Sequence, residues 1–131
     1  MSIASDMYME KEQEIQDKQY KYPYHYIPEW RNDGFSQTQH WSWGYRYLGG
    51  IKVVLDQLRQ QSFNSLIDIG CGDGRFLKEV VATYPDIRAL GIDYSERAIR
   101  LAQALNPEIR YDVRNIINES LDEVFDVAVL V

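Results

Sequence analysis

Residues 66–76 read LIDIGCGDGRF, an apolar run that leads directly into a loop with glycines at positions 70, 72 and 74. A short apolar run that ends in glycines is typical of a buried strand entering a turn. A glycine loop of this kind usually lets the backbone approach a bound phosphate. Here, however, the carboxylates of Asp68 and Asp73 border the glycines. The stretch therefore predicts a strand and a ligand-binding loop, with a ligand that tolerates negative charge around it.

Downstream of this loop the sequence alternates between strand and helix patterns. Apolar residues recur every three or four positions in two segments, which predict helices, and Ser95 is placed to be the N-cap of the second. Strands that alternate with helices predict an α/β fold with a parallel sheet, and right-handed crossovers place helices on both faces. The predicted strands are residues 65–70, 87–93, 108–113 and 125–131, the predicted helices are residues 74–84 and 95–105, and residues 115–124 are a loop or a short helix.

The first 42 residues differ in character from the rest. Residues 20–30 hold two prolines and alternating tyrosines, which favour an extended segment, and residues 31–37 are expected to form a turn. Apolar residues at helical spacing begin near Trp43. We therefore expect an aromatic-rich arm or cap at residues 1–42 and an α/β ligand-binding domain at residues 43–131.

The composition restricts the class of protein. The chain has 131 residues, enough for one domain with its own core, and a formal net charge of −6, which disfavours binding to nucleic acid. Its single cysteine, Cys71, excludes an internal disulfide and a thiolate cluster, and we expect no metal site. No segment has the apolar length of a transmembrane helix or the core of a signal peptide. A cytoplasmic protein without membrane contact is expected.

Two phosphate-binding motifs fit the glycine loop poorly. A dinucleotide fingerprint requires its third glycine at position 75, where this chain has Arg75. The Gly-Lys-Ser/Thr sequence of a P-loop is absent. Asp68 and Asp73 would also repel a pyrophosphate at the start of the following helix. An NAD-dependent oxidoreductase is therefore the less favoured alternative.

The acids match a ligand that carries positive charge. S-adenosylmethionine has a sulfonium and an ammonium group, which suit Asp68 and the loop carbonyls, and a carboxylate, which suits the N–H groups at the helix start. Asp93 ends the second strand, where it could accept hydrogen bonds from two ribose hydroxyls. Asp112 ends the third strand and could bind an adenine amino group, with the backbone N–H of Val113 beside it. All three acids lie at carboxyl ends of parallel strands, where such sheets bind ligands.

These motifs resemble a known family. LIDIGCGDGRF, GIDYS (residues 91–95) and RYDV (residues 110–113) resemble the first motifs of class I S-adenosylmethionine-dependent methyltransferases over about residues 63–131. The resemblance implies a Rossmann-like sheet in strand order 3-2-1-4 and S-adenosyl-L-methionine as the cofactor. It implies that Asp68, Gly70, Gly72 and Gly74 hold the methionine part, that Asp93 holds the ribose, that Asp112 and Val113 hold the adenine, and that Tyr94 also contacts the cofactor.

The family continues its sheet to the order 3-2-1-4-5-7-6, whereas this chain ends in the apolar stretch VAVLV at residues 127–131. A strand of this kind is typical of the middle of a sheet. We therefore expect a fragment truncated after the fourth strand, whose exposed strand edge could support self-association. The alternative is a natural terminus that the N-terminal segment covers.

Each acid also has a purely structural explanation. Asp68 could cap the helix after the loop, Asp93 could cap the next helix, and Asp112 could be an ordinary turn residue. Asp73 is expected to be a solvated residue in the first turn of a helix. Cys71 is expected to be a small loop residue rather than a nucleophile.

The remaining polar residues do not identify a catalytic base. His25 and His40 are expected to be packing or surface residues, with a general base at an acceptor site as the alternative. Arg46 is expected to be an exposed arginine rather than a partner of the methionine carboxylate. The tyrosines of residues 20–26 fit an arm packed on the domain better than a lid. The predicted function is a methyltransferase with a small-molecule acceptor. The alternative from another class is a non-catalytic module that binds S-adenosylmethionine or a related adenosine compound.

Overall fold

The structure, a computed structural model, describes residues 11–17, 29–31, 34–36 and 38–131, and side chains for residues 11–17 and 46–131. The chain forms two compact units, Met1–Leu48 and Gly49–Val131. The second unit contains the glycine loop and all of the predicted cofactor-binding residues.

The described part of the first unit consists of a short helix, two short strands and the beginning of a long helix. Residues 11–17 are helical, and β1 (Glu29–Arg31) pairs antiparallel with β2 (Gly34–Ser36). β2 lies within residues 31–37, so the prediction of a turn is wrong for residues 34–36. α2 (Thr38–Leu58) begins before the predicted start near Trp43. The predictions for His25, for the side chain of His40 and for the tyrosines of residues 20–26 lie outside the described residues.

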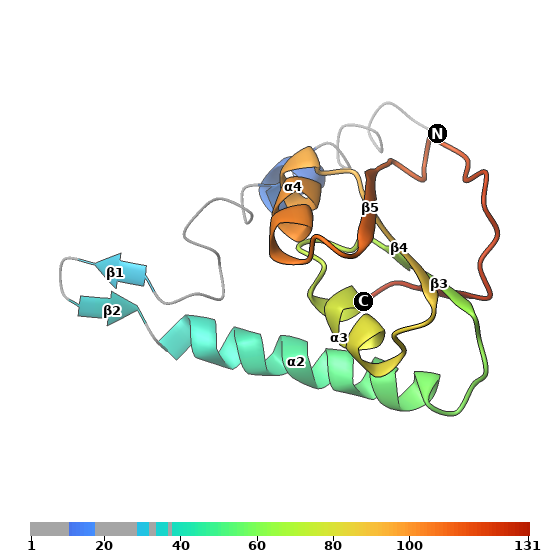
Figure 1. Cartoon of the computed structure of the whole chain (residues 1–131). Coiled ribbons are helices and arrows are strands. Elements are labelled where there is room, and N and C mark those ends of the chain that lie inside the picture. The colour runs from blue at the N-terminus through green and yellow to red at the C-terminus, as the bar shows by residue number, and fades with distance from the viewer. Residues whose placement is uncertain (1–10, 18–28, 32–33, 37) are drawn as a thin grey trace. The chain divides into compact units, whose positions relative to one another are not determined.

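The second unit is built on a four-stranded parallel sheet in the spatial order β5-β4-β3-β6 (Figure 1). Counted along the chain from β3, this order is 3-2-1-4, so the predicted α/β fold and strand order are confirmed. The strands are β3 (Ser65–Ile69), β4 (Arg88–Asp93), β5 (Arg110–Val113) and β6 (Val127–Val129), and the helices after the first two strands are α3 (Arg75–Thr83) and α4 (Glu96–Leu105).

Local sequence signals set the ends of both helices. α4 begins after Ser95, whose hydroxyl accepts a hydrogen bond from the backbone N–H of Ala98 at 3.2 Å, which confirms the predicted N-cap. α3 begins after Gly74, a left-handed residue with φ 77°, and ends before Pro85. Proline disfavours helical geometry at the residue before it, so the chain leaves the helix there.

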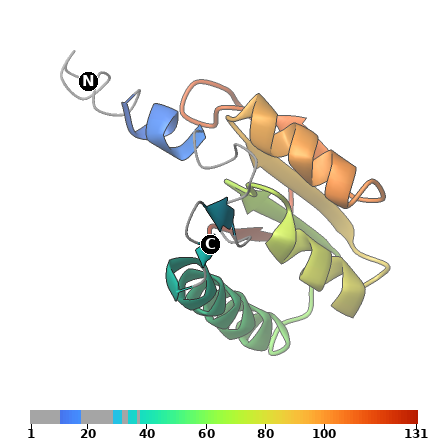
Figure 2. The same cartoon turned by 90° about the vertical axis from the view of Figure 1, so that its left-hand side faces the viewer.

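α3 and α4 pack on the strands (Figure 2), and a glycine in β4 leaves room for side chains of α3 and β5. Tyr111 of β5 lies beside Gly91 of β4 in register. A Cβ atom at Gly91 would lie 2.6 Å from the Tyr111 ring and 2.8 Å from Leu77 of α3. Only glycine leaves room for both side chains, and the resulting layer is fully buried at Phe76, Leu77 and Val80.

The β5–β6 connection packs on the opposite face of the sheet. The buried cluster of this face is Ile67, Leu90 and Ile92, and Leu121 and Phe125 from the connection pack against it. The sequence predicts a loop or a short helix at residues 115–124, and the structure has a turn at 116–118 and no helix there.

The last strand is only partly buried. Val129 of β6 is buried, whereas Leu130 and Val131 are exposed. Within the described sheet β6 pairs with β3 alone.

Candidate functional site

The glycine loop is fixed to the carboxyl end of β4 by backbone hydrogen bonds. The N–H groups of Gly70 and Cys71 both donate to the carbonyl of Ile92, at 2.8 and 2.9 Å. Gly70, Gly72 and Gly74 all have positive φ values, of 78°, 55° and 77°. Since other residues rarely adopt this conformation, the path of the loop depends on these glycines.

Asp93 joins three parts of the site. It ends β4, is almost fully buried, and accepts hydrogen bonds from the backbone N–H of Gly72 at 3.0 Å and of Ser95 at 2.9 Å. Ser95, not Asp93, is the N-cap of α4, so the capping explanation for Asp93 is wrong. A carboxylate offers about four lone pairs and can accept several hydrogen bonds at once.

Asp68 is the most deeply buried of the acids. Its exposed fraction is 2%, and its burial, together with repulsion from Asp93 and Asp73, raises the pKa of its carboxyl group to about 7. α3 has no side-chain cap, so Asp68 does not serve as the helix cap. The carboxyl group is thus held in a place where a nearby cation would stabilise its charge.

Asp73 lies in the loop rather than in the helix. It is buried, and it accepts a hydrogen bond from the backbone N–H of Arg75 at 3.3 Å, just before α3 begins. The prediction of a solvated first-turn residue is therefore wrong. The Asp73 side chain thus folds back against the loop backbone. Its carboxylate is a third acid near Asp68 and Asp93.

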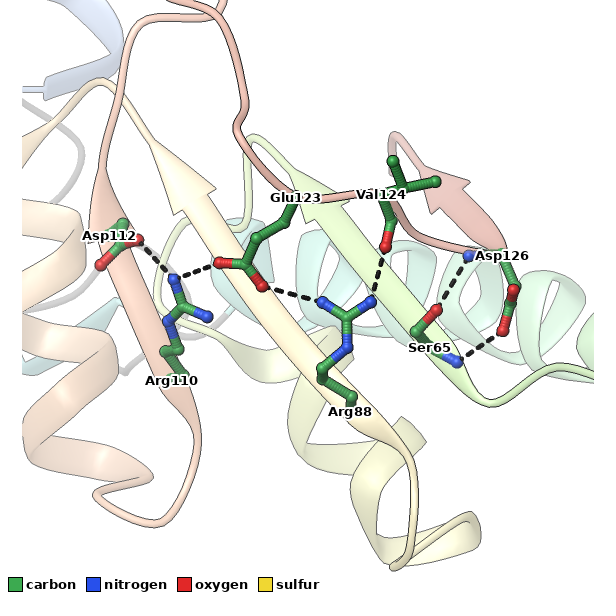
Figure 3. Close-up of polar contacts among 7 residues, drawn as sticks. All are labelled: Ser65, Arg88, Arg110, Asp112, Glu123, Val124 and Asp126. Atoms are coloured by element: carbon green, nitrogen blue, oxygen red, sulfur yellow. Dashed lines mark hydrogen bonds and ion pairs between the residues drawn. The ribbon is translucent and has the colours of Figure 1, made fainter.

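Asp112 and Val113 lie on the neighbouring strand at the same edge of the sheet. Val113 is the register partner of Asp93, and Asp112 is the partner of Ile92. Asp112 is part of β5, so the turn explanation is wrong. Figure 3 shows its carboxylate beside Arg110, with an N–O distance of 3.4 Å, and Arg110 in turn beside Glu123 at 2.6 Å.

Glycine is required at position 74 for a packing reason that the sequence did not reveal. A Cβ atom there would collide with the hydroxyl end of Tyr111, a buried residue of β5. At Gly70, by contrast, a Cβ atom would meet nothing within 4 Å. Gly70 thus borders open space, while Gly74 accommodates a core side chain. The alternation along residues 110–113 was the signal that Tyr111 points into the core.

Three further residues considered in the sequence analysis are Cys71, Tyr94 and Arg46. Cys71 is buried, and its burial and the neighbouring Asp68 raise the pKa of its thiol, so it is not an activated nucleophile. Tyr94 follows Asp93 at the edge of the sheet and is partly buried. Arg46 is exposed and belongs to the first unit.

The chain was compared with known proteins. Residues 67–131 match the model of a family described as "Methyltransferase domain". A putative methyltransferase 235L of Invertebrate iridescent virus 6 is 34% identical over 85 residues, which is 65% of this chain and 32% of the viral protein. The ribosomal RNA large subunit methyltransferase G of Shewanella oneidensis is 38% identical over 55 residues, 42% of this chain and 15% of that protein.

Solved structures that resemble this chain are also described as methyltransferases. The plantazolicin methyltransferase BpumL in complex with SAH is 33% identical, with a TM-score of 0.50, over 54% of this chain and 28% of that one. Coclaurine N-methyltransferase, at 16% identity and a TM-score of 0.59 over 72% of this chain and 28% of that one, shares the fold. This chain spans about a third or less of the length of these proteins.

The part of the chain that the structure describes contains no helix with the length and apolar character needed to cross a bilayer.

Proposed function

We propose that this chain, which belongs to the class I S-adenosylmethionine-dependent methyltransferase family through residues 67–131, binds S-adenosylmethionine at the carboxyl edge of its sheet. In the proposed function it forms the cofactor-binding part of an enzyme that transfers the sulfonium methyl group. The observation that carries this proposal is the glycine loop bordered by three buried acids, Asp68, Asp73 and Asp93. A cationic ligand fits such a site, and a polyanion does not.

The residues of the site fit the parts of this cofactor. Asp68 would face its positive groups, because it is a buried carboxyl group and the charged groups that raise its pKa, Asp93 and Asp73, are also acids. Gly70 and Gly72 would leave the backbone open to the methionine part, which agrees with the empty space beside Gly70. Asp93 would accept bonds from the ribose hydroxyls. On the next strand, Asp112 and Val113 would hold the adenine, with Tyr94 as a further contact.

The bound cofactor would supply an activated methyl group, and the protein would orient it toward the acceptor. Positioning is the main contribution expected from this chain, because an intramolecular arrangement removes much of the entropic barrier. Gly74 would act indirectly, because the absence of a side chain there lets Tyr111 of the core pack against the loop. We assign no catalytic base.

We propose a small molecule as the methyl acceptor, in a cytoplasmic protein. The net charge of −6 supports this proposal, since a nucleic acid would be repelled at long range. One solved neighbour, BpumL, is described in complex with desmethylPZN analogs. Ribosomal RNA is the alternative acceptor, favoured by the similarity to a ribosomal RNA methyltransferase over 55 residues. In this proposal the cofactor-binding domain comprises residues 43–131, and residues 1–42 form an arm or cap that is separate from it.

The alternative function is a non-catalytic module that binds the same cofactor. Incubating the purified chain with cofactor labelled in the methyl group, and with extract as the source of acceptor, separates the two functions. Retention of label without transfer supports the module, and transfer supports the enzyme.

Calorimetry with S-adenosylhomocysteine and with NAD tests the binding site itself. We expect binding of S-adenosylhomocysteine alone, and Asp93→Ala should weaken it by about 1–3 kcal/mol because the hydroxyl partners and the Gly72 N–H lose their acceptor. Asp86→Ala, which removes an exposed carboxylate, is the matched control. Binding of NAD instead, or equal affinity in folded Asp93→Ala and Asp86→Ala, would refute the site.

A further inference from the structure

Four charged side chains form a chain of ion pairs across β4, β5 and the β5–β6 connection (Figure 3). One guanidinium nitrogen of Arg110, Nη2, lies 2.6 Å from Oε1 of Glu123 and 3.4 Å from Oδ2 of Asp112. The other carboxylate oxygen of Glu123 accepts a hydrogen bond from Arg88 at 2.8 Å. Glu123 thus lies between two cations, whereas Asp112 is the last member of the chain.

Glu123 is fixed in place by its neighbours in the β5–β6 connection. Arg88, its second partner, also donates to the carbonyl of Val124, and the guanidinium of Arg88 lies 4.3 Å from the centre of the Phe125 ring. Phe125 in turn packs against the buried cluster of the sheet. The Glu123 carboxylate is therefore held from the core, while the Arg110 side chain is half-exposed and has room to reorient.

The two distances show which acid holds Arg110. Contacts between guanidinium nitrogens and carboxylate oxygens are usually about 2.7–2.9 Å long. The contact of Arg110 with Glu123 is at least as close as this, and its contact with Asp112 is longer. Among the described residues, Arg110 is the only recorded partner of Asp112, and it contacts one of the two carboxylate oxygens. Glu123 thus draws Arg110 away from Asp112.

Asp112 lies on the strand beside the anchor of the glycine loop. Its register partner is Ile92, whose carbonyl accepts hydrogen bonds from the N–H groups of Gly70 and Cys71. Paired strands are about 4.8 Å apart, so Asp112 is one strand spacing from this anchor. A guanidinium paired with a carboxylate partly neutralises it and competes with any other donor. The position of Arg110 therefore sets how well Asp112 can accept a hydrogen bond from a ligand.

We propose that Glu123 is a positioning residue for the cofactor, which keeps Arg110 from closing on Asp112 and so leaves the Asp112 carboxylate available to the adenine amino group. This inference rests on the proposed function, in which Asp112 binds the adenine. Without the charge of Glu123, Arg110 pairs fully with Asp112, and recognition of the amino group weakens. Glu123 acts through Arg110 and needs no contact with the cofactor.

Two ligands separate this role from general damage to the site. S-inosylhomocysteine differs from S-adenosylhomocysteine only in its base, where a carbonyl oxygen replaces the exocyclic amino group and the adjacent ring nitrogen carries a proton. The two compounds have the same charges, so a change in the long-range field or a looser site affects both alike. The ratio of their dissociation constants therefore reports the hydrogen bonds made to this edge of the base.

The test is titration calorimetry of the full chain with both ligands at pH 7. Glu123→Gln should lower the preference for S-adenosylhomocysteine by about threefold, a size that fits the modest strength of an exposed ion pair. The double variant Arg110→Gln/Glu123→Gln should regain the wild-type preference, because the competing guanidinium is gone. Asp122→Asn removes a charge from the exposed neighbouring residue and is the matched control, with the wild-type preference. Circular dichroism confirms that each variant is folded.

Two further variants test the same inference without relying on Glu123→Gln. Arg110→Gln alone should keep or raise the preference for S-adenosylhomocysteine. Asp112→Asn should lower this preference by about tenfold, because the amino group loses a charged acceptor. Adding Glu123→Gln to Asp112→Asn should then change nothing more.

An unchanged preference in Glu123→Gln, or a double variant with the same loss as Glu123→Gln, would overturn the role of Glu123 and leave the proposed function intact. A loss in Arg110→Gln would do the same, since Arg110 would then support Asp112 instead of competing for it. A wild-type preference in Asp112→Asn would overturn the adenine assignment together with this inference. Failure of the wild type to bind either ligand would overturn the proposed cofactor site itself.

Discussion

Gly70 and Gly74 belong to one loop, but glycine is required at the two positions for different physical reasons. Their φ values are nearly equal, at 78° and 77°. A side chain at Gly70 would enter open space, whereas a side chain at Gly74 would collide with Tyr111. Backbone geometry restricts both positions, and core packing restricts only the second.

This difference predicts two distinct stability losses. Gly70→Ala should lower the free energy of unfolding by about 1 kcal/mol, the cost of a left-handed alanine. Gly74→Ala should lower it by about 3 kcal/mol, because overpacking against Tyr111 adds to the same backbone cost. Urea unfolding of both variants measures the difference, and Gly70→Ala is the matched control for φ. Equal losses would show that Tyr111 does not restrict Gly74.

Asp68 makes the free protein sensitive to pH. Its pKa is raised from 3.8 to about 7 in the folded state, so the folded protein binds more protons than the unfolded chain between these values. Stability that the protonated group provides is therefore lost as the pH rises toward 7.

The matching prediction compares Asp68→Asn with wild type in the absence of cofactor. From pH 5 to pH 8.5 the variant should gain about 2 kcal/mol relative to wild type, because asparagine has no charge to bury. Chemical unfolding at the two pH values measures the gain. A constant difference between the two proteins would show that the Asp68 pKa is not raised.

At the scale of elements, the β5–β6 connection is held to the amino ends of the strands. Asp126 accepts a hydrogen bond from the backbone N–H of Ser65 at 3.0 Å, and its own N–H donates to the Ser65 hydroxyl at 2.9 Å (Figure 3). It also accepts a hydrogen bond from the backbone N–H of Asn64 at 2.8 Å. Arg88 donates to the carbonyl of Val124 and lies over the ring of Phe125. These contacts bring β6 beside β3 without a helix in the crossover.

Asp126→Ala should therefore destabilise the protein at neutral pH, because two backbone N–H groups lose their acceptor. The hydrogen bond from Asn64, followed by that from Ser65, lowers the pKa of Asp126 below its usual 3.8. The stabilisation is thus present above pH 4 and disappears as the pH falls through the lowered pKa. Thermal unfolding of Asp126→Ala and of the control Asp86→Ala at pH 7 and pH 3 measures it. Equal melting temperatures at pH 7 would contradict this assignment.

At the scale of the whole molecule, the two edges of the described sheet are covered to different extents. β5 and β4 carry α4, whereas β6 pairs only with β3 within the described sheet. Val124, Leu130 and Val131 are exposed near β6. An open strand edge with apolar neighbours is a template for pairing with another chain.

We predict that the chain self-associates through β6. The weight-average mass from sedimentation equilibrium should rise with protein concentration, and Ala128→Lys, at an exposed position of β6, should reduce the rise because charge on an edge strand opposes pairing. Ala104→Lys, at an exposed position of α4, is the control. A constant monomer mass at all concentrations would refute self-association.

The sequence by itself determined the order of elements, the parallel sheet and the glycine loop. Periodicity identifies strands and helices because side-chain burial repeats every two or 3.6 residues, and Ser95 marks a helix start by local chemistry. The acids at positions 68, 93 and 112 could be placed at one edge because parallel strands end on the same side.

Only the tertiary structure decided what those residues contact. It buried Asp73, which a linear pattern placed in solvent, and it packed Tyr111 against Gly74 from a strand that follows 37 positions later. It also covered one face of the sheet with Leu121 and Phe125 instead of a helix. Such contacts join residues that are distant in the chain, and their energies depend on geometry in space, which periodicity along the sequence does not record.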